Sequence, residues 1–317
     1  MGHTCSWLLA AVLMAGCATG RARPLATPPP SPDVGAAADA QTVGASMSAY
    51  VQAVRELSRR ARPRPTDVQR AERWSPDLAA AIASHSAAPT VENEVSLAQA
   101  FIRLGIADQA YEHFAKAARL DPGEGAAWDG LARIWRDWGF PHIGLGDAYR
   151  AVYAAPMSPA VHNTLGTILQ SLGKGREARA RFVRVLALDA DAAYAQNNLC
   201  YSWLMEANAD AASVECSRAL AIEPGLIPAR NNLALARAIA GDLAGAAEIF
   251  GAAGGEAAAQ YNLGIVCLAQ RRYPAAADAF DRAAALQPSL VLARARARQA
   301  RRHAADAVED GGFYERR

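Results

Sequence analysis

Between residues 91 and 290 the sequence repeats itself every 34 residues, with one unit four residues shorter than the others. The seventh residue of every unit is leucine, and the eighth and twentieth are alanine, glycine or cysteine. Such regularity indicates one supersecondary unit used six times, because each unit hides its apolar face only by stacking on the next. The units are 91–124, 125–158, 159–192, 193–226, 227–256 and 257–290.

The order of small and large residues within each unit predicts two antiparallel helices. Small residues let the two helices approach closely, and leucine and phenylalanine fill the groove between one pair and the next. Glycines stand midway through four units, where the first helix has to end and turn: Gly105, Gly139, Gly173 and Gly241. Prolines follow the second helix of four units, where a connection tolerates them: Pro122, Pro156, Pro224 and Pro288.

This pattern resembles the tetratricopeptide repeat over about 200 residues. The resemblance implies an all-α fold, a right-handed α-solenoid of six tetratricopeptide helix pairs over residues 91–290. Two departures from the pattern are local. Arg237 and Cys267 replace the usual bulky residue at the eleventh position, and the fifth unit is shortened at Gly254 and Gly255. Weaker packing and a kink are expected there.

Helices are also expected before the repeats, in a lead-in over residues 46–90 that packs against the first repeat. Apolar residues recur at helical spacing from Met47 to Ala61, and two prolines end that helix. Ser75 followed by Pro76 has the order of an N-cap and a first helical residue. A second helix is therefore expected to begin at Pro76.

A helix is also expected after the repeats, within residues 291–317. Two interpretations of it are open. It is either a basic contact for an acidic partner or membrane surface, or a solvated helix that covers the last apolar face, as every solenoid requires. The capping interpretation is favoured. The basic residues concerned are Arg294, Arg296, Arg298, Arg301 and Arg302.

The first 17 residues have the form of an export signal, with an apolar stretch too short to span a bilayer. Their end resembles the lipobox of bacterial lipoproteins, in which the cysteine, here Cys17, is acylated. By the same resemblance, Ala18 after the cysteine points to the outer membrane, with the chain anchored on the periplasmic side. The alternatives are an ordinary cleaved signal or a misassigned start codon. Residues 18–45 are rich in proline and alanine and are expected to form a disordered tether.

The first helices of the repeats carry a row of amides. By resemblance to peptide-binding members of the family, these positions line a concave groove, and side-chain amides match the donors and acceptors of a peptide backbone. The alternative is that asparagine merely hydrates the helix surface. Tyr194 and Met205 are expected on the same face. The proposed peptide-binding residues are Asn163, Asn197, Asn198, Tyr201, Asn231, Asn232, Tyr261 and Asn262.

Two cysteines fall on facing helices of the fourth repeat. Cys200 and Cys216 are either a disulfide pair, as an oxidising compartment allows, or two small apolar core residues. The second interpretation is favoured. Cys267 is expected to be buried and inert.

The remaining composition argues against several function classes. A formal charge of +2 supplies no basic face for nucleic acid. The six histidines include no pair at helical ligand spacing, so no metal site, cofactor or small-molecule substrate is expected. His113 and His162 are interpreted as packing or surface residues. The residue set by which some family members capture a chaperone carboxyl terminus is not matched. The protein is therefore expected not to be an enzyme.

Together these features favour an outer-membrane adaptor that binds an extended peptide or an assembly component such as a secretin or pilus protein. The stretches NNLALARAIAGDLAGAAEIF and YNLGIVCLAQRRYPAAADAF resemble lipoproteins of tight-adherence (Flp-type) pilus assembly. The layout is also similar to that of type IV pilus pilotins. The alternative is a scaffold subunit of a cell-envelope or polysaccharide-export complex that uses the convex face.

Overall fold

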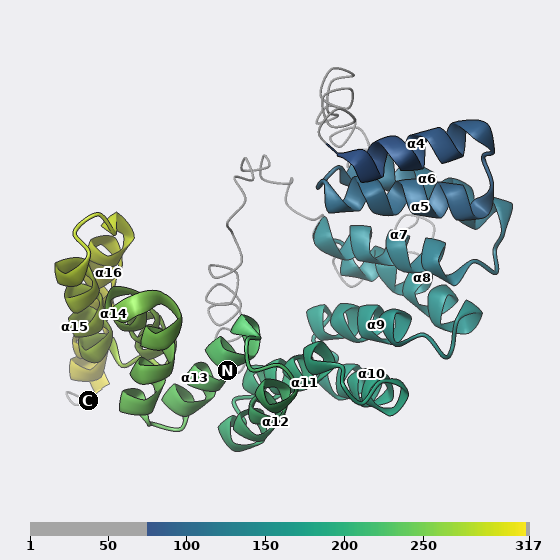
Figure 1. Ribbon diagram of the computed structural model, residues 1–317. Coiled ribbons are helices and arrows are strands. Elements are labelled where there is room, and N and C mark those ends of the chain that lie inside the picture. Colours follow the sequence, from purple (N-terminus) through teal and green to yellow (C-terminus); the bar gives the residue numbers. More distant parts are fainter. Residues whose placement is uncertain (1–74, 315–317) are drawn as a thin grey trace. The chain divides into compact units, whose positions relative to one another are not determined.

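The computed structural model describes residues 75–314, whose regular secondary structure consists of α-helices (Figure 1). The expected all-α fold of helix pairs is confirmed over this range. None of the helices within it is long and apolar enough to cross a membrane. Cys17, the tether and the expected helix from Met47 to Ala61 lie outside the described residues.

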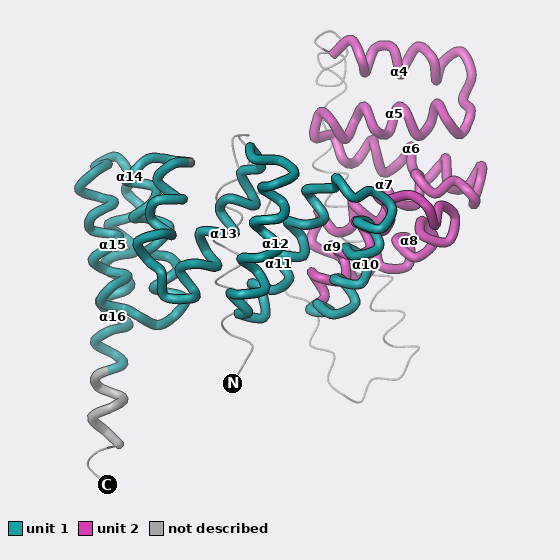
Figure 2. Tube along the Cα trace, turned by 60° about the horizontal axis from the view of Figure 1, so that its bottom comes forward, with its two compact units in different colours: residues 1–21, 173–317 teal, residues 22–172 magenta. Residues whose placement is uncertain are grey.

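The chain divides into two compact units, which Figure 2 distinguishes by colour. The described part of the N-terminal unit is residues 75–172, and that of the C-terminal unit is residues 173–314. The third repeat is split by this division, because its first helix belongs to the N-terminal unit and its second to the C-terminal unit.

The N-terminal unit begins with the expected lead-in helix. Ser75 caps it, since its Oγ accepts a hydrogen bond from the Leu78 amide at 3.3 Å. The Leu78 side chain is fully buried and packs with Val95 and Phe101 of the first repeat. The helices are α4 (Pro76–Ala87), α5 (Val91–Arg103), α6 (Ala107–Leu120), α7 (Gly125–Asp137), α8 (Pro141–Ala154) and α9 (Pro159–Ser171).

The C-terminal unit contains the later repeats and the last helix. The kink expected in the fifth repeat is confirmed: Gly255 has a φ of 80° inside one long helix, α14, which joins the second helix of repeat five to the first of repeat six. The helices are α10 (Gly175–Leu188), α11 (Ala193–Met205), α12 (Ala209–Ile222), α13 (Ile227–Ile239), α14 (Leu243–Ala269), α15 (Tyr273–Leu286) and α16 (Val291–Tyr314).

Helix α16 packs on α15. Its alanines Ala293, Ala297 and Ala300 are buried, while Arg294 and Arg298 are exposed. Small residues on one face let α16 lie close to α15, and the arginines on the other face are in contact with solvent.

The turn between the two helices of a repeat is made in the left-handed region of φ. The four glycines expected there have φ between 72° and 97°. In the fourth and sixth repeats the same place is occupied by Ala207, with a φ of 56°, and by Arg271, with a φ of 58°. The backbone geometry of the turn is therefore kept where the sequence has no glycine.

The favoured interpretation of the cysteine pair is wrong. Cys200 on α11 and Cys216 on α12 form a disulfide bond. Both positions are small and fully buried because α11 and α12 approach closely, and that closeness is what brings the two sulfur atoms together. Cys267 is free and buried, as expected.

Candidate functional site

The proposed peptide-binding residues of the C-terminal unit lie on three consecutive first helices. Asn197, Asn198 and Tyr201 are on α11, Asn231 and Asn232 are on α13, and Tyr261 and Asn262 are on the second half of α14. Helices α11 and α13 are in contact, so their amides are neighbours. Asn163 is on α9 of the N-terminal unit and is considered separately from them.

Two of these amides bind each other. The Nδ2 of Asn232 donates a hydrogen bond to the Oδ1 of Asn197 at 2.9 Å. Asn232 is only 3% exposed, and its Oδ1 is buried without a hydrogen-bond partner. Asn232 therefore joins the fourth and fifth repeats and is too deep to meet a ligand unless side chains move.

The other residues of the row are half-buried. Asn198 and Asn231 each present part of their side chain to solvent, as do Asn262 and Tyr201. A side-chain amide that reaches solvent offers donors and an acceptor that suit water or a peptide group. Asn197 and Tyr261 are half-buried as well.

The tyrosines of the row differ in their surroundings. Burial raises the pKa of the Tyr201 hydroxyl, so the phenol stays neutral and remains a donor as well as an acceptor. The Tyr261 ring packs edge-on against Phe280, with centroids 5.4 Å apart. Tyr194, expected on the same face, is 41% exposed. Together they supply apolar surface beside the amides.

A similar link between repeats occurs in the N-terminal unit. Thr164 on α9 forms a hydrogen bond with the carboxylate of Asp129 on α7. Asp129 is buried, with one carboxylate oxygen unpartnered, and this desolvation raises the pKa of its carboxyl group. Both links connect the fifth residue of one repeat to the sixth of the next. The sequence predicts these first-helix positions to be ligand contacts, and no local pattern in it indicates their role between repeats.

A second surface was not anticipated from the sequence. An aromatic hollow in the N-terminal unit is lined by residues of the α6–α7 connection and of α7 and α8. Trp128 is held by a hydrogen bond from its Nε1 to the carbonyl of Pro122 at 2.9 Å, and the guanidinium of Arg150 lies 4.8 Å from the centre of its ring. The lining residues are Pro122, Trp128, Tyr149, Arg150 and Tyr153.

Comparison with known proteins agrees with this architecture. A family model described as the tetratricopeptide repeat matches residues 257–290, the sixth repeat. No curated protein matches the chain. Among solved structures, the Cut9–Hcn1 hetero-tetramer of the APC/C aligns with a TM-score of 0.56 at 16% identity, over 69% of this chain and 45% of that one. This chain thus spans less than half of that relative.

Two further structures are matched over nearly their whole length. PilW, described as a widely conserved type IV pilus biogenesis factor, aligns with a TM-score of 0.54 at 22% identity, over 62% of this chain and 94% of that one. PilF of Pseudomonas aeruginosa aligns with a TM-score of 0.52 at 18% identity, over 64% and 94%. The fold is that of tetratricopeptide-repeat solenoids, in which helix pairs stack one after another.

Proposed function

We propose that this protein is a lipid-anchored adaptor that binds a protein partner at the periplasmic side of the outer membrane. In this proposal the acylated Cys17 anchors the chain and residues 18–45 serve as the tether. The partner belongs to an envelope machine of the pilus or secretin type, and the protein acts by binding, not by catalysis. The similarity of its fold to PilW supports this assignment.

The observation that carries the proposal is the run of accessible amides and phenols on consecutive first helices of the C-terminal unit. Asn198, Asn231 and Asn262 project from α11, α13 and α14 at partial exposure. A backbone in extended conformation offers one donor and one acceptor per residue, and a side-chain amide complements both. Such a surface binds a segment mainly through its main chain, so it suits an unpaired strand of an assembly component.

A photocrosslinking experiment in the native host tests this surface. A photoreactive amino acid replaces Tyr201 in one variant and Val214 in the other, since Val214 is 50% exposed on α12, the second helix of the same repeat. We expect one discrete crosslinked partner from position 201, which mass spectrometry identifies as an envelope-assembly protein. Equal crosslinking from both positions, or none from position 201, would contradict the proposal.

Substitution of the amides gives an independent measure. Asn198→Ala combined with Asn262→Ala is expected to reduce the yield of the crosslink from position 201 by tenfold or more, the effect of losing two hydrogen bonds of about 1 kcal/mol each. Ser217→Ala on the exposed side of α12 is the matched control and leaves the yield unchanged.

The anchor is tested separately. Mass spectrometry of the mature protein is expected to find a fatty-acylated Cys17 at its first residue, and the protein is expected in the outer-membrane fraction. Cys17→Ser releases it into the soluble periplasmic fraction. An unacylated amino terminus at another residue would contradict the lipid anchor. The adaptor role would then be tested by the crosslinking experiment alone.

A scaffold subunit of an envelope or polysaccharide-export complex is the second candidate. The aromatic hollow favours it, because Tyr153 is 90% exposed and Tyr149 is 44% exposed on α8, the second helix of the second repeat. Tyrosines that present apolar surface to water are typical of interface residues. A Tyr149→Ala, Tyr153→Ala variant that loses the assembled complex while the crosslink from position 201 persists would favour this candidate.

A further inference from the structure

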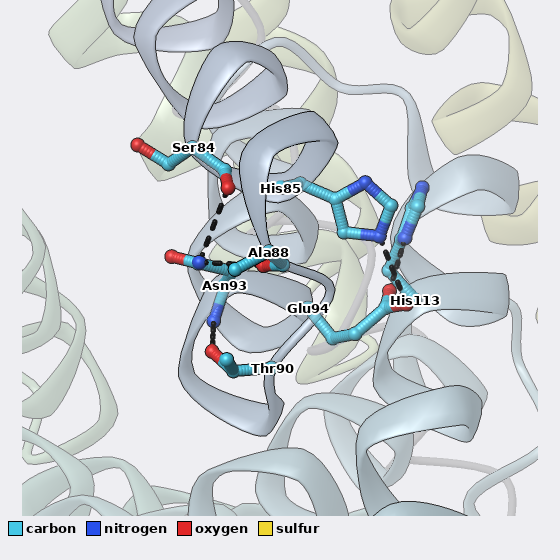
Figure 3. A network of polar contacts seen from close by, with 7 residues as sticks. All are labelled: Ser84, His85, Ala88, Thr90, Asn93, Glu94 and His113. Atoms are coloured by element: carbon cyan, nitrogen blue, oxygen red, sulfur yellow. Dashed lines mark hydrogen bonds and ion pairs between the residues drawn. The ribbon is translucent and has the colours of Figure 1, made fainter.

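Two histidines and one glutamate converge at the N-terminal end of the repeats. His85 lies in the last turn of α4, Glu94 in the first turn of α5 and His113 on α6. Both rings are directed at the Glu94 carboxylate (Figure 3). His85 Nε2 is 2.9 Å from Oε1, and His113 Nδ1 is 2.5 Å from Oε2. Three elements thus contribute one potential metal ligand each.

The cluster is enclosed by protein. The Glu94 side chain is 5% exposed, His113 is 12% exposed and His85 is 23% exposed. The remaining access is on the side of His85, from which an ion or a water molecule can enter. An acidic side chain buried to this degree needs positive charge or several hydrogen bonds around it.

The three side chains are also held in place by their surroundings. Asn93 Nδ2 donates to the carbonyls of Ser84 and Ala88, at 3.2 and 2.8 Å, which fixes the end of α4 beside the start of α5 (Figure 3). The His113 ring stacks on Phe101, with centroids 5.6 Å apart. The ligand geometry is therefore pre-organised, which lowers the entropic cost of binding an ion.

We propose that His85, Glu94 and His113 bind a divalent transition-metal ion, with Zn²⁺ as the best match. The candidate ligand atoms all lie within 4.8 Å of one another. Tetrahedral zinc needs its ligand atoms about 3.4 Å apart, given bonds of about 2.0–2.2 Å, so small side-chain rotations complete the site. Imidazole nitrogens and one carboxylate oxygen are ligands that zinc accepts, and water takes the fourth position.

Binding needs no net release of protons from neutral rings. An ionised carboxylate only accepts hydrogen bonds, so in a neutral ring the nitrogen that faces Glu94 is the one that donates. When a metal binds to that nitrogen, the ring gives up this proton to water and takes one from water at its other nitrogen, which leaves the proton count unchanged. Lys116 is the cation that acts on Glu94 and His113 electrostatically, and its side chain is exposed. Solvent screening weakens its opposition to a bound metal, although that opposition remains measurable.

The consequence of metal binding is a clamp on the lead-in helix. Helix α4 is followed by a three-residue connection and packs on α5 around Leu78. A metal bound to α4, α5 and α6 at once ties that helix to the first repeat. Because only the folded state brings the three ligands together, the binding free energy adds to the stability of this end of the stack.

Zinc binding by the full-length protein, stripped of metal with a chelator, tests the proposal. Titration calorimetry with Zn²⁺ is expected to give one site, and X-ray absorption is expected to show two imidazoles and oxygen ligands around the metal. His85→Asn and Glu94→Gln are expected to weaken binding by at least about tenfold each. His142→Asn, at an exposed histidine on α8, is the matched control and keeps the wild-type affinity.

Two further measurements separate a metal site from a hydrogen-bonded triad. Zn²⁺ is expected to raise the Tm of the wild type and of His142→Asn but not of His85→Asn, while Mg²⁺ raises none of them. Lys116→Gln removes the opposing charge and is expected to tighten zinc binding. Absence of zinc binding, or equal affinity in the wild type and His85→Asn, would overturn the proposal and leave Glu94 as an acceptor for two histidines only.

Discussion

Asn232 of the fifth repeat donates its side-chain amide to Asn197 of the fourth, and this contact ties α13 to α11 inside the C-terminal unit. The two partners differ in burial, since Asn232 is buried and Asn197 is half-buried. The difference matters because a buried amide that loses its hydrogen-bond partner is left desolvated, which destabilises the folded state. An exposed amide that loses its partner forms a hydrogen bond to water instead.

Asn197→Ala is therefore expected to destabilise the protein more than Asn232→Ala. Asn197→Ala leaves the buried Asn232 amide without a partner, which costs about 1–3 kcal/mol. Asn232→Ala removes that amide together with a side-chain carbonyl that had no hydrogen-bond partner, so it leaves no buried group of this side chain unsatisfied. The double variant is expected to resemble Asn232→Ala alone. Urea unfolding measures all three, and Ser217→Ala serves as the surface control. Additive effects of the two single changes would contradict the contact.

The disulfide is expected to stabilise the fourth repeat. It closes a loop between residues 16 apart in sequence, for which the chain-entropy relation gives about 3 kcal/mol. Cys216→Ala should lower the free energy of unfolding by about that amount, and a reducing agent should do the same to the wild type but not to the variant. Cys267→Ala keeps the disulfide, so it is the control that should stay as sensitive to the reducing agent as the wild type.

Alkylation in denaturant without reductant gives the chemical check on this bond. It is expected to label Cys267 and to leave Cys200 and Cys216 unmodified. Labelling of Cys200 and Cys216 would show that this pair is reduced. The two cysteines would then be small core residues, which is the interpretation that the sequence favoured.

Two glycines of α8 provide a matched pair for the close approach of helices. A Cβ added to Gly144 would lie 2.8 Å from the Ala132 carbonyl oxygen and 3.0 Å from the Trp135 Cβ, whereas one added to Gly146 meets nothing within 4 Å. Gly144→Ala is expected to destabilise by about 1–3 kcal/mol because α7 and α8 have to separate. Gly146→Ala is expected to stabilise by about 0.5–1 kcal/mol, because glycine is a poor helix former. Thermal unfolding distinguishes the two, and equal effects would refute the close packing.

The sequence predicted the parts of the fold that repeat. A small residue at Gly144 and a turn at Gly139 recur at fixed spacing, so six copies of the pattern reveal what one copy does not. The turns at Ala207 and Arg271 have the same positive φ without a glycine, because the packing of the flanking helices imposes the conformation there. Only the length of the repeat, and not the residue type, indicated those turns.

The candidate sites were less predictable, because depth and long-range contacts are not periodic. Asn197 and Asn232 carry the same amide, and sequence position alone did not show that one of them is buried. His85, Glu94 and His113 are separated by 9 and 19 residues on three different helices, so no local motif marks them. The cysteine pair lay on facing helices, but spacing left both interpretations open.

Asp129 predicts a pH dependence of stability in the acid range. Burial raises the pKa of its carboxyl in the folded state above the unfolded value, against the opposing effects of Thr164 and Arg133. The folded state therefore binds a proton more readily than the unfolded state does. Above the folded-state pKa the carboxylate is charged and its burial lowers the free energy of unfolding by the full amount. This destabilisation disappears as the pH falls through the folded-state pKa toward the unfolded-state pKa of about 3.9.

Removing the titrating group should remove this dependence. The free energy of unfolding of the wild type minus that of Asp129→Asn is expected to rise between pH 7 and pH 4, because only the wild type gains from protonation at this position. Asp278→Asn, at an exposed carboxylate on α15, is the control for a general effect of charge. Urea unfolding at both pH values gives the comparison. A difference that stays constant or falls as the solution becomes more acidic would mean that Asp129 is not a desolvated carboxylate, and that Thr164 and the arginines stabilise its charge fully.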